Sequence, residues 1–345
     1  MRLSRMARRG RGAFMGKADV GRLEADARRQ NPVGGRSGVI AWVAPMAIQR
    51  RLIALVRGLR PKQWIKNLLV FAGFVFTMNE RWRPFSPTMW TFLERSAMAF
   101  ALFSFMSSSV YLLNDIRDVE KDRLHPTKKN RPIASGVLPP KLALVTALLL
   151  IPTCLALAFW LSPAFSGVLA GYFVMQLGYI LALKEVVLLD VFILAIGFVM
   201  RAISGAIVIG VSISPWLYTV TLLGALFLGL CKRRSEVVLL EQNAGSHRKI
   251  LAHYTPALLD SLISIVASST VMAYSLYTFT SPKQGNNLMM LTIPFVIFGL
   301  FRYLFLAHTR NAGGSPEEVF LRDKPLVATL GCWILTTGLV LTLAR

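Results

Sequence analysis

Long apolar runs separated by short polar segments fill most of the sequence after residue 63. A helix needs roughly 20 mostly apolar residues to cross a bilayer, and nine runs come within reach of that length. The first run is the weakest, because Lys66 and Asn67 lie near its start. The pattern predicts an all-α integral membrane protein with nine transmembrane helices, over 64–80, 92–114, 138–161, 163–183, 186–210, 214–231, 257–280, 287–308 and 325–344.

The composition agrees with this pattern, since 54% of the residues are hydrophobic, 16% are charged and the mean hydropathy is +0.53. A soluble protein of this length would carry more charge. The cysteines Cys154, Cys231 and Cys332 are dispersed without metal or redox spacing, and the four histidines show no ligand pairing. We therefore expect a protein that is embedded in the lipid bilayer and has neither a zinc site nor a catalytic triad.

Basic residues are distributed unequally between the two sides that the predicted spans define. Of the 39 Lys and Arg, 32 lie in the N-terminal segment through Lys66 and in the loops 116–141, 184–185, 231–256 and 308–324, whereas 4 lie on the opposite side. Cytoplasmic loops are the ones enriched in Lys and Arg. The basic side is therefore predicted to face the cytoplasm from the inner (plasma) membrane, and the net charge of +22 does not indicate nucleic-acid binding.

The first 50 residues differ from the rest, because they are rich in Arg and Gly and contain no long apolar run. A secretory signal has an apolar region after its charges, so this segment is not one. We expect a disordered cytoplasmic tail over residues 1–50 that can contact anionic lipid. The transmembrane domain is then expected over residues 51–345.

An acidic motif follows the second predicted span and is the most informative segment of the chain. Asp115, Asp118 and Asp122 are three and four residues apart, so on a helix their carboxylates would share one face, and Asn114 adds an amide oxygen. Carboxylates at the membrane edge are costly without a cation, and hard oxygen ligands in this number suit Mg²⁺. The alternative interpretation is a solvated acidic helix end, since basic residues interleave with the acids.

Basic side chains follow this motif and also precede the first span. Lys128 and Arg131 lie in the next loop, where a metal-bound phosphate would need cations, and Arg can bind two phosphate oxygens at once. The same residues also satisfy the positive-inside rule. Lys66 and Asn67 end a second group that begins with Arg60, and by itself this group is typical of an interfacial anchor.

Further polar groups lie at the membrane edge or within the spans. Asp190 and Arg201 are eleven residues apart, about three helical turns, so both can face one side of the fifth span. An intramembrane Arg usually faces a polar cavity and has a partner, so a structural ion pair is the alternative to substrate binding. The other members of these groups are Tyr179, Lys184, Lys232, Arg233, Glu236, Glu241 and Arg302.

Together these motifs resemble the UbiA prenyltransferase superfamily of integral membrane transferases. The resemblance rests on Asn114-Asp115-x-x-Asp118-x-x-x-Asp122, on Tyr179 to Lys184 and on the nine spans. Within the superfamily the chain is most similar to the decaprenyl-phosphate phosphoribosyltransferases, from about residue 52 onward. The closer similarity is carried by Arg60-Pro61-x-Gln63-Trp64-x-Lys66-Asn67, His125-Pro126-Thr127-Lys128, Arg131-Pro132-Ile133-Ala134, Lys232-Arg233-x-x-Glu236 and Arg302-Tyr303.

The resemblance implies nine helices around a central cavity that opens to the membrane. It implies transfer of 5-phosphoribose from 5-phosphoribosyl 1-diphosphate (PRPP) to a polyprenyl phosphate, for precursors of cell-envelope polysaccharide. It also implies Mg²⁺ bound by Asn114, Asp115, Asp118 and Asp122, with the three aspartates catalytic, and it leaves a homo-oligomer open. The substrate-binding residues expected from it are Lys66, Asn67, Asn114, Lys128, Arg131, Tyr179, Lys184, Arg201, Lys232, Arg233, Glu236, Glu241 and Arg302.

Two other functions compete with this one. An aromatic or lipid prenyltransferase would share the metal motif, but such enzymes usually carry a second Asp-x-x-x-Asp between spans six and seven. This chain has Glu236 and Glu241 there, which favours the phosphoribosyl donor. A transporter would distribute polar residues through its spans, whereas these residues cluster on the predicted cytoplasmic side.

Overall fold

The computed structural model describes residues 49–212, 214–242, 249–280, 288–309, 319 and 322–343. The elements discussed below belong to the compact unit Val56–Arg345. The predicted tail over residues 1–50 lies outside the described residues, apart from its last two positions, and the side chain of Glu241 lies outside them as well.

The described chain is almost entirely helical, as predicted, and eight of its helices are long and apolar enough to cross a membrane. Their boundaries lie within a few residues of the predicted spans, except that the sixth continues about three turns further. The eight are α5 (Pro87–Arg117), α7 (Pro140–Leu161), α8 (Pro163–Leu181), α9 (Leu189–Val208), α10 (Pro215–Gln242), α11 (Pro256–Thr280), α12 (Ile293–Thr309) with the preceding turn η5 (Leu288–Thr292), and α14 (Lys324–Leu343).

Residues at the N-termini explain where several of these helices begin. Proline occupies the first position of five of them, where its missing N–H costs nothing and its fixed φ suits the helix. The hydroxyl of Ser86 accepts a hydrogen bond from the Met89 N–H, and the hydroxyl of Ser162 accepts one from the Phe165 N–H. These two serines cap α5 and α8.

The first predicted span is the exception to the nine expected helices. It forms a 3₁₀ helix, η1 (Pro61–Phe71), followed by one short α-helix, α4 (Ala72–Phe76). Side chains three residues apart lie above one another in a 3₁₀ helix, and here they pack on α5. The Trp64 Nε1 donates to Ser108 Oγ at 3.0 Å and the Asn67 Nδ2 donates to Ser104 Oγ at 2.9 Å. The tighter winding thus places both polar groups on the face that meets the α5 serines.

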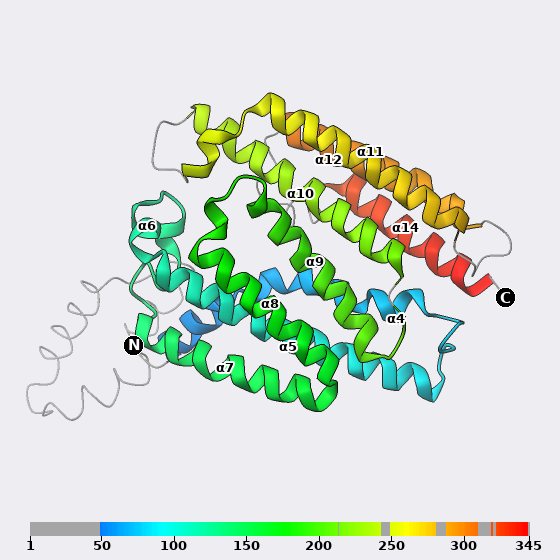
Figure 1. Ribbon diagram of the computed structural model, residues 1–345, viewed down its shortest axis with the longest axis horizontal. Helices are drawn as coiled ribbons and strands as arrows, with labels where there is room; N and C mark the ends of the chain where they lie inside the picture. The colour runs from blue at the N-terminus through cyan, green and yellow to red at the C-terminus, as the bar shows by residue number, and fades with distance from the viewer. Residues whose placement is uncertain are drawn as a thin grey trace, which may run out of the picture. The chain divides into compact units, whose positions relative to one another are not determined.

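Helix α9 lies between two hydrophobic cores and contributes to both (Figure 1). Its Val191 and Ala195 pack with α10, α11, α12 and α14, whereas Val208 packs with η1, α5, α7 and α8. Figure 1 shows α10, α11, α12 and α14 side by side on one side of α9, with α5, α7 and α8 on the other. The sequence therefore folds into two groups of spans joined through one helix.

Arg95 shows how a charged residue is accommodated inside a predicted span. Its Nε donates to the carbonyl of Val208 at 2.5 Å, and its Nη2 donates to the carbonyl of Leu161 at 2.9 Å. These carbonyls end α9 and α7, and the C-terminus of a helix carries partial negative charge. Arg95 therefore caps two helices at the end of the bundle opposite the acidic motif.

Gly205 is expected to be essential for the contact between η1 and α9. A Cβ at this position would lie 1.7 Å from the Val70 carbonyl oxygen, so Gly205→Ala must push the two backbones apart. Overpacking of this kind typically costs about 1–3 kcal/mol or more. We expect a lower thermal unfolding midpoint in detergent. Gly167→Ala is the matched control, because nothing lies within 4 Å of its Cβ, and an equal loss in both variants would contradict the prediction.

Candidate active site

The acidic motif is divided between two helices instead of lying on one. α5 ends at Arg117, Asp118 adopts φ −91° and ψ 10°, and α6 (Val119–Leu124) begins immediately after it. The backbone bonds continue across the junction, with the Asp118 N–H 2.9 Å from the Asn114 carbonyl and the Asp122 N–H 2.8 Å from the Asp118 carbonyl. The junction keeps the helical spacing of Asp115 and Asp122 but leaves Asp118 at a kink.

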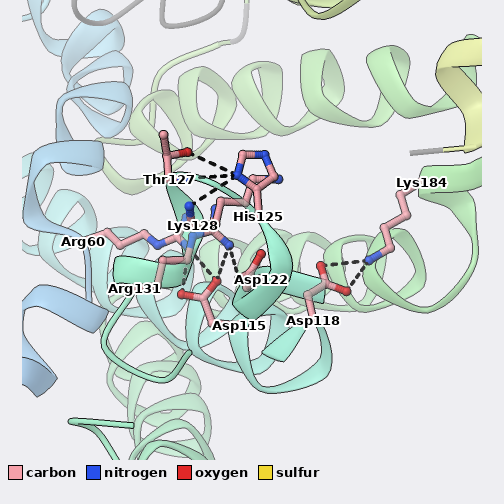
Figure 2. Close-up of polar contacts among 9 residues, drawn as sticks. All are labelled: Arg60, Asp115, Asp118, Asp122, His125, Thr127, Lys128, Arg131 and Lys184. Atoms are coloured by element: carbon pink, nitrogen blue, oxygen red, sulfur yellow. Dashed lines mark hydrogen bonds and ion pairs between the residues drawn. The ribbon is translucent and has the colours of Figure 1, made fainter. Parts of the chain in front are cut away.

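Asp115 and Asp122 converge on one cation, Arg131 (Figure 2). The same guanidinium nitrogen, Nη1, lies 3.0 Å from Asp115 Oδ1 and 2.7 Å from Asp122 Oδ2. Both carboxylates are buried, and the Nη2 of Arg60 lies 2.5 and 2.7 Å from the two oxygens of Asp115. A buried carboxylate needs such compensation, because desolvation of an unpaired charge is very costly.

Asp118 is directed toward a different element (Figure 2). Its two oxygens lie 2.9 and 3.1 Å from the Lys184 Nζ in η3 (Leu183–Glu185), the turn that follows α8. The expectation that all three carboxylates share one face is therefore met by Asp115 and Asp122 and not by Asp118, because the helix is interrupted there. Among the described residues, no three His, Cys, Asp or Glu side chains form a group that could hold a metal ion.

The loop after α6 positions Arg131 through short-range bonds. The His125 Nδ1 accepts hydrogen bonds from the N–H groups of Thr127 and Lys128 at 3.3 and 3.4 Å, which closes the turn before η2 (Lys128–Asn130). The Arg131 N–H then bonds to the Lys128 carbonyl at 2.9 Å. Lys128 thus lies in the same turn as Arg131, as the sequence predicted. Arg60 also belongs to the site, although the sequence indicated it only as part of a motif and not as a site residue.

Arg201 lies in a buried polar network and does not pair with Asp190. Its Nε donates to Asn67 Oδ1 at 2.6 Å, its Nη1 to the Gly197 carbonyl at 2.6 Å and its Nη2 to the Tyr172 hydroxyl at 3.0 Å. The guanidinium also lies 5.0 Å from the centre of the Tyr172 ring, a cation–π distance. The predicted alternative of an Asp190–Arg201 ion pair is wrong, because neighbouring helices offer each residue a nearer partner.

The partner of Asp190 is Arg233 of α10, and both side chains are buried. The Arg233 Nε lies 2.5 Å from Asp190 Oδ2, and its Nη1 contacts Glu236 one helical turn away. The Tyr254 hydroxyl donates to Asp190 Oδ1 at 2.9 Å and accepts from the Leu188 N–H at 2.7 Å. This ion-paired cluster includes Glu236, one of the two glutamates that the sequence has where a prenyltransferase would carry a second aspartate pair.

Arg302 joins α12 to the beginning of α14. Its Nε and Nη2 lie 3.1 and 2.9 Å from the two oxygens of Asp323. Asp323 Oδ1 also accepts a hydrogen bond from the Leu326 N–H at 3.0 Å and so caps α14. The remaining predicted site residues lie at the same end of the bundle: Asn114 on the last turn of α5, Tyr179 near the end of α8, Lys66 on η1, and Lys232 and Glu241 on α10.

An apolar cavity of about 310 Å³ lies among α10, α12 and α14. Its lining is almost free of polar atoms and includes Phe227, Phe295, Tyr303, Leu326 and Trp333. A cavity of this size and lining suits a hydrocarbon chain and not a charged group.

The chain belongs to the UbiA prenyltransferase family, which matches residues 67–322. It is 36% identical over 291 residues to the decaprenyl-phosphate phosphoribosyltransferase of Corynebacterium glutamicum, covering 81% of this chain and 84% of that one. It is 35% identical over 285 residues to the enzyme of the same name from Mycobacterium tuberculosis, covering 82% and 93%. The fold is similar to that of a UbiA homologue from Archaeoglobus fulgidus bound to GPP and Mg²⁺, with a TM-score of 0.64 at 18% identity over 84% of this chain and 99% of that one.

Tyr254→Phe is expected to destabilise the fold by about 1–3 kcal/mol, because it leaves the Leu188 N–H and one Asp190 oxygen without this bond. Burial, opposed by the bond from Leu188 and reinforced by Asp190, raises the pKa of Tyr254 to about 12. The folded protein holds the hydroxyl proton more tightly than the unfolded chain does. The resulting contribution to the free energy of unfolding is therefore complete below about pH 10, the ordinary pKa of tyrosine, and is lost as the pH rises through 12. Between pH 7 and 9, the thermal unfolding midpoint of Tyr254→Phe should therefore lie below that of the wild type by a constant amount. Tyr218→Phe, at an exposed position, is the control, and the same deficit there would contradict the assignment.

Proposed function

We propose that this membrane protein transfers 5-phosphoribose from PRPP to a polyprenyl phosphate, of the decaprenyl phosphate type, and releases diphosphate. The observation that carries the proposal is the 35–36% identity, over more than four fifths of the chain, with decaprenyl-phosphate phosphoribosyltransferases of three genera. The site supports it, because carboxylates and cations from separate elements meet at one end of the bundle. The Asp190–Arg233–Glu236 cluster also favours a phosphoribosyl donor, since no second aspartate pair stands there.

The chemistry of this transfer fits the side chains that are present. An oxygen of the lipid phosphate forms a bond to the anomeric carbon of the ribose. The bond from that carbon to the diphosphate oxygen breaks, and diphosphate leaves with the electron pair. The attacking phosphate is already ionised, so the reaction needs no strong general base. The difficult part is the departure of a highly charged leaving group, and positioned cations lower that barrier.

Mg²⁺ is the cofactor that the donor set suits. Asp115 and Asp122 present oxygens that already converge on a single guanidinium nitrogen, whereas Asp118 is paired with Lys184. Hard carboxylate oxygens of this kind hold Mg²⁺ together with substrate phosphates. When bound there, Mg²⁺ would neutralise charge on the departing diphosphate.

Basic residues around the carboxylates would bind the phosphate groups of the donor. Arg60, Arg131 and Lys184 come from three different elements and all contact the acidic motif. Lys66, Lys128 and Lys232 lie at the same end of the bundle. Arg201 contributes indirectly, because its bond to Asn67 fixes the face of η1 on which Asn67 lies. We assign Arg201 and Arg302 to positioning, because Arg201 fixes η1 through Asn67 and Arg302 joins α12 to the residue that caps α14.

The lipid acceptor would enter from the bilayer, with its isoprenoid chain in the apolar cavity among α10, α12 and α14. The excess of basic residues on the side of the acidic motif supports a cytoplasmic site in the inner membrane. PRPP is a water-soluble anion, so a site on that side would receive it directly. The isoprenoid chain of the acceptor would stay in the membrane throughout.

The donor is tested with purified protein, labelled PRPP and decaprenyl phosphate. We expect a new labelled lipid and stoichiometric diphosphate. The control reaction contains geranylgeranyl diphosphate and an aromatic acceptor in place of PRPP and decaprenyl phosphate, and it should give no product. Prenyl transfer to the aromatic ring with PRPP left intact would instead support the prenyltransferase alternative.

Asp122→Asn and Asp115→Asn are expected to lower the rate of transfer at least 100-fold, because each removes a buried carboxylate from the centre of the site. Removal of divalent metal with EDTA should abolish transfer, and added Mg²⁺ should restore it. Glu120→Gln is the matched control, since Glu120 lies on α6 together with Asp122 but is exposed and pairs with Arg123. The variant should keep its rate within about 3-fold, a range typical of surface changes. Full activity of metal-free wild-type protein would contradict the metal assignment.

A further inference from the structure

Arg131 occupies the position between the two carboxylates where a shared metal ion would bind (Figure 2). Its Nη1 is 3.0 Å from Asp115 Oδ1 and 2.7 Å from Asp122 Oδ2. The two aspartate side chains are 3% and 6% exposed, whereas the Arg131 side chain is 26% exposed. The carboxylates are therefore fixed in the protein interior, while the cation between them reaches them from the solvent side.

The site is also balanced in charge without any metal. Asp115 has a second cation in Arg60, and Asp118 has Lys184. Three carboxylates thus face three cations, each supplied by a different segment of the chain. A buried carboxylate is destabilising when its cation is removed and nothing replaces it. A metal ion that binds these carboxylates can therefore take the place of one of the protein's cations.

Mg²⁺ and the Arg131 guanidinium cannot both lie between these carboxylates. Mg²⁺ binds oxygen at about 2.0–2.1 Å, and two cations at such a short separation repel strongly. The side chain of Arg131 is long and partly exposed, so it can leave without moving the buried carboxylates. After it leaves, it would be available to a phosphate group of the donor, which a guanidinium can contact with two N–H groups.

We propose that Arg131 is the resting counter-ion of Asp115 and Asp122, which Mg²⁺ displaces and which then binds the phosphate of the donor. Metal and phosphate would each make the other's binding more favourable, because the metal releases the cation that the phosphate needs. Such coupling between two ligands is reciprocal. The inference rests on the metal assignment of the proposed function and is independent of which diphosphate donor is used.

The first test measures binding of Mn²⁺, used as the spectroscopic substitute for Mg²⁺, to detergent-solubilised protein without phosphate, PRPP or lipid acceptor. Arg131→Gln should bind Mn²⁺ about 10-fold more tightly than the wild type, because the competing cation is gone. Lys129→Gln removes the same charge from the same loop at an exposed position and should change affinity less than 2-fold. Equal or weaker binding in Arg131→Gln, or equal tightening in Lys129→Gln, would overturn the proposal.

A second test uses the wild-type protein, so it does not depend on folding of a variant. The rate at which phenylglyoxal modifies Arg131 is measured by mass spectrometry and divided by the rate for Arg123, whose partner Glu120 is exposed. Mg²⁺ alone should raise this ratio several-fold, and diphosphate added with Mg²⁺ should lower it again. An unchanged ratio with Mg²⁺ would mean that Arg131 stays in place and would refute the displacement. Neither test requires PRPP, so a failed donor assay would leave its result interpretable.

Discussion

A charged group inside a membrane bundle must find its partners within the protein, and this constraint organises the structure. Arg95 satisfies it with two helix-terminal carbonyls, Arg201 with an amide, a carbonyl and a phenol, and Arg233 with two carboxylates. Each of these guanidiniums joins elements that are distant in sequence. The buried charges therefore serve as connections between spans, and replacement of one partner would leave the other without compensation.

Helix α9 is where these connections meet. Near its first turn Asp190 joins it to α10, and further along Arg201 joins it to η1. Gly205 then allows the backbone of η1 to approach so closely that no side chain fits between them. The two hydrophobic cores share this helix, and its polar contacts connect η1 of one group of spans with α10 of the other.

The same constraint gives the candidate site its chemical character. Its carboxylates are paired with Arg60, Arg131 and Lys184, so each buried negative charge has a cation within the protein. A metal with a bound phosphate brings both signs of charge at once and can replace the internal pairs without a net cost in charge. Under the proposed function, this arrangement would suit a substrate that is a metal-bound diphosphate.

The sequence determined the parts of this protein that depend on local composition. Eight spans follow from apolar runs, their beginnings follow from proline and serine, and the acidic motif follows from its spacing. Tertiary structure alone decided which cation faces which carboxylate, because Arg60 and Asp115 are 55 residues apart and Lys184 and Asp118 are 66 apart. It also decided that the first span winds as a 3₁₀ helix and that Asp190 pairs with Arg233. Such choices depend on the approach of distant backbones, which no local pattern of residues encodes.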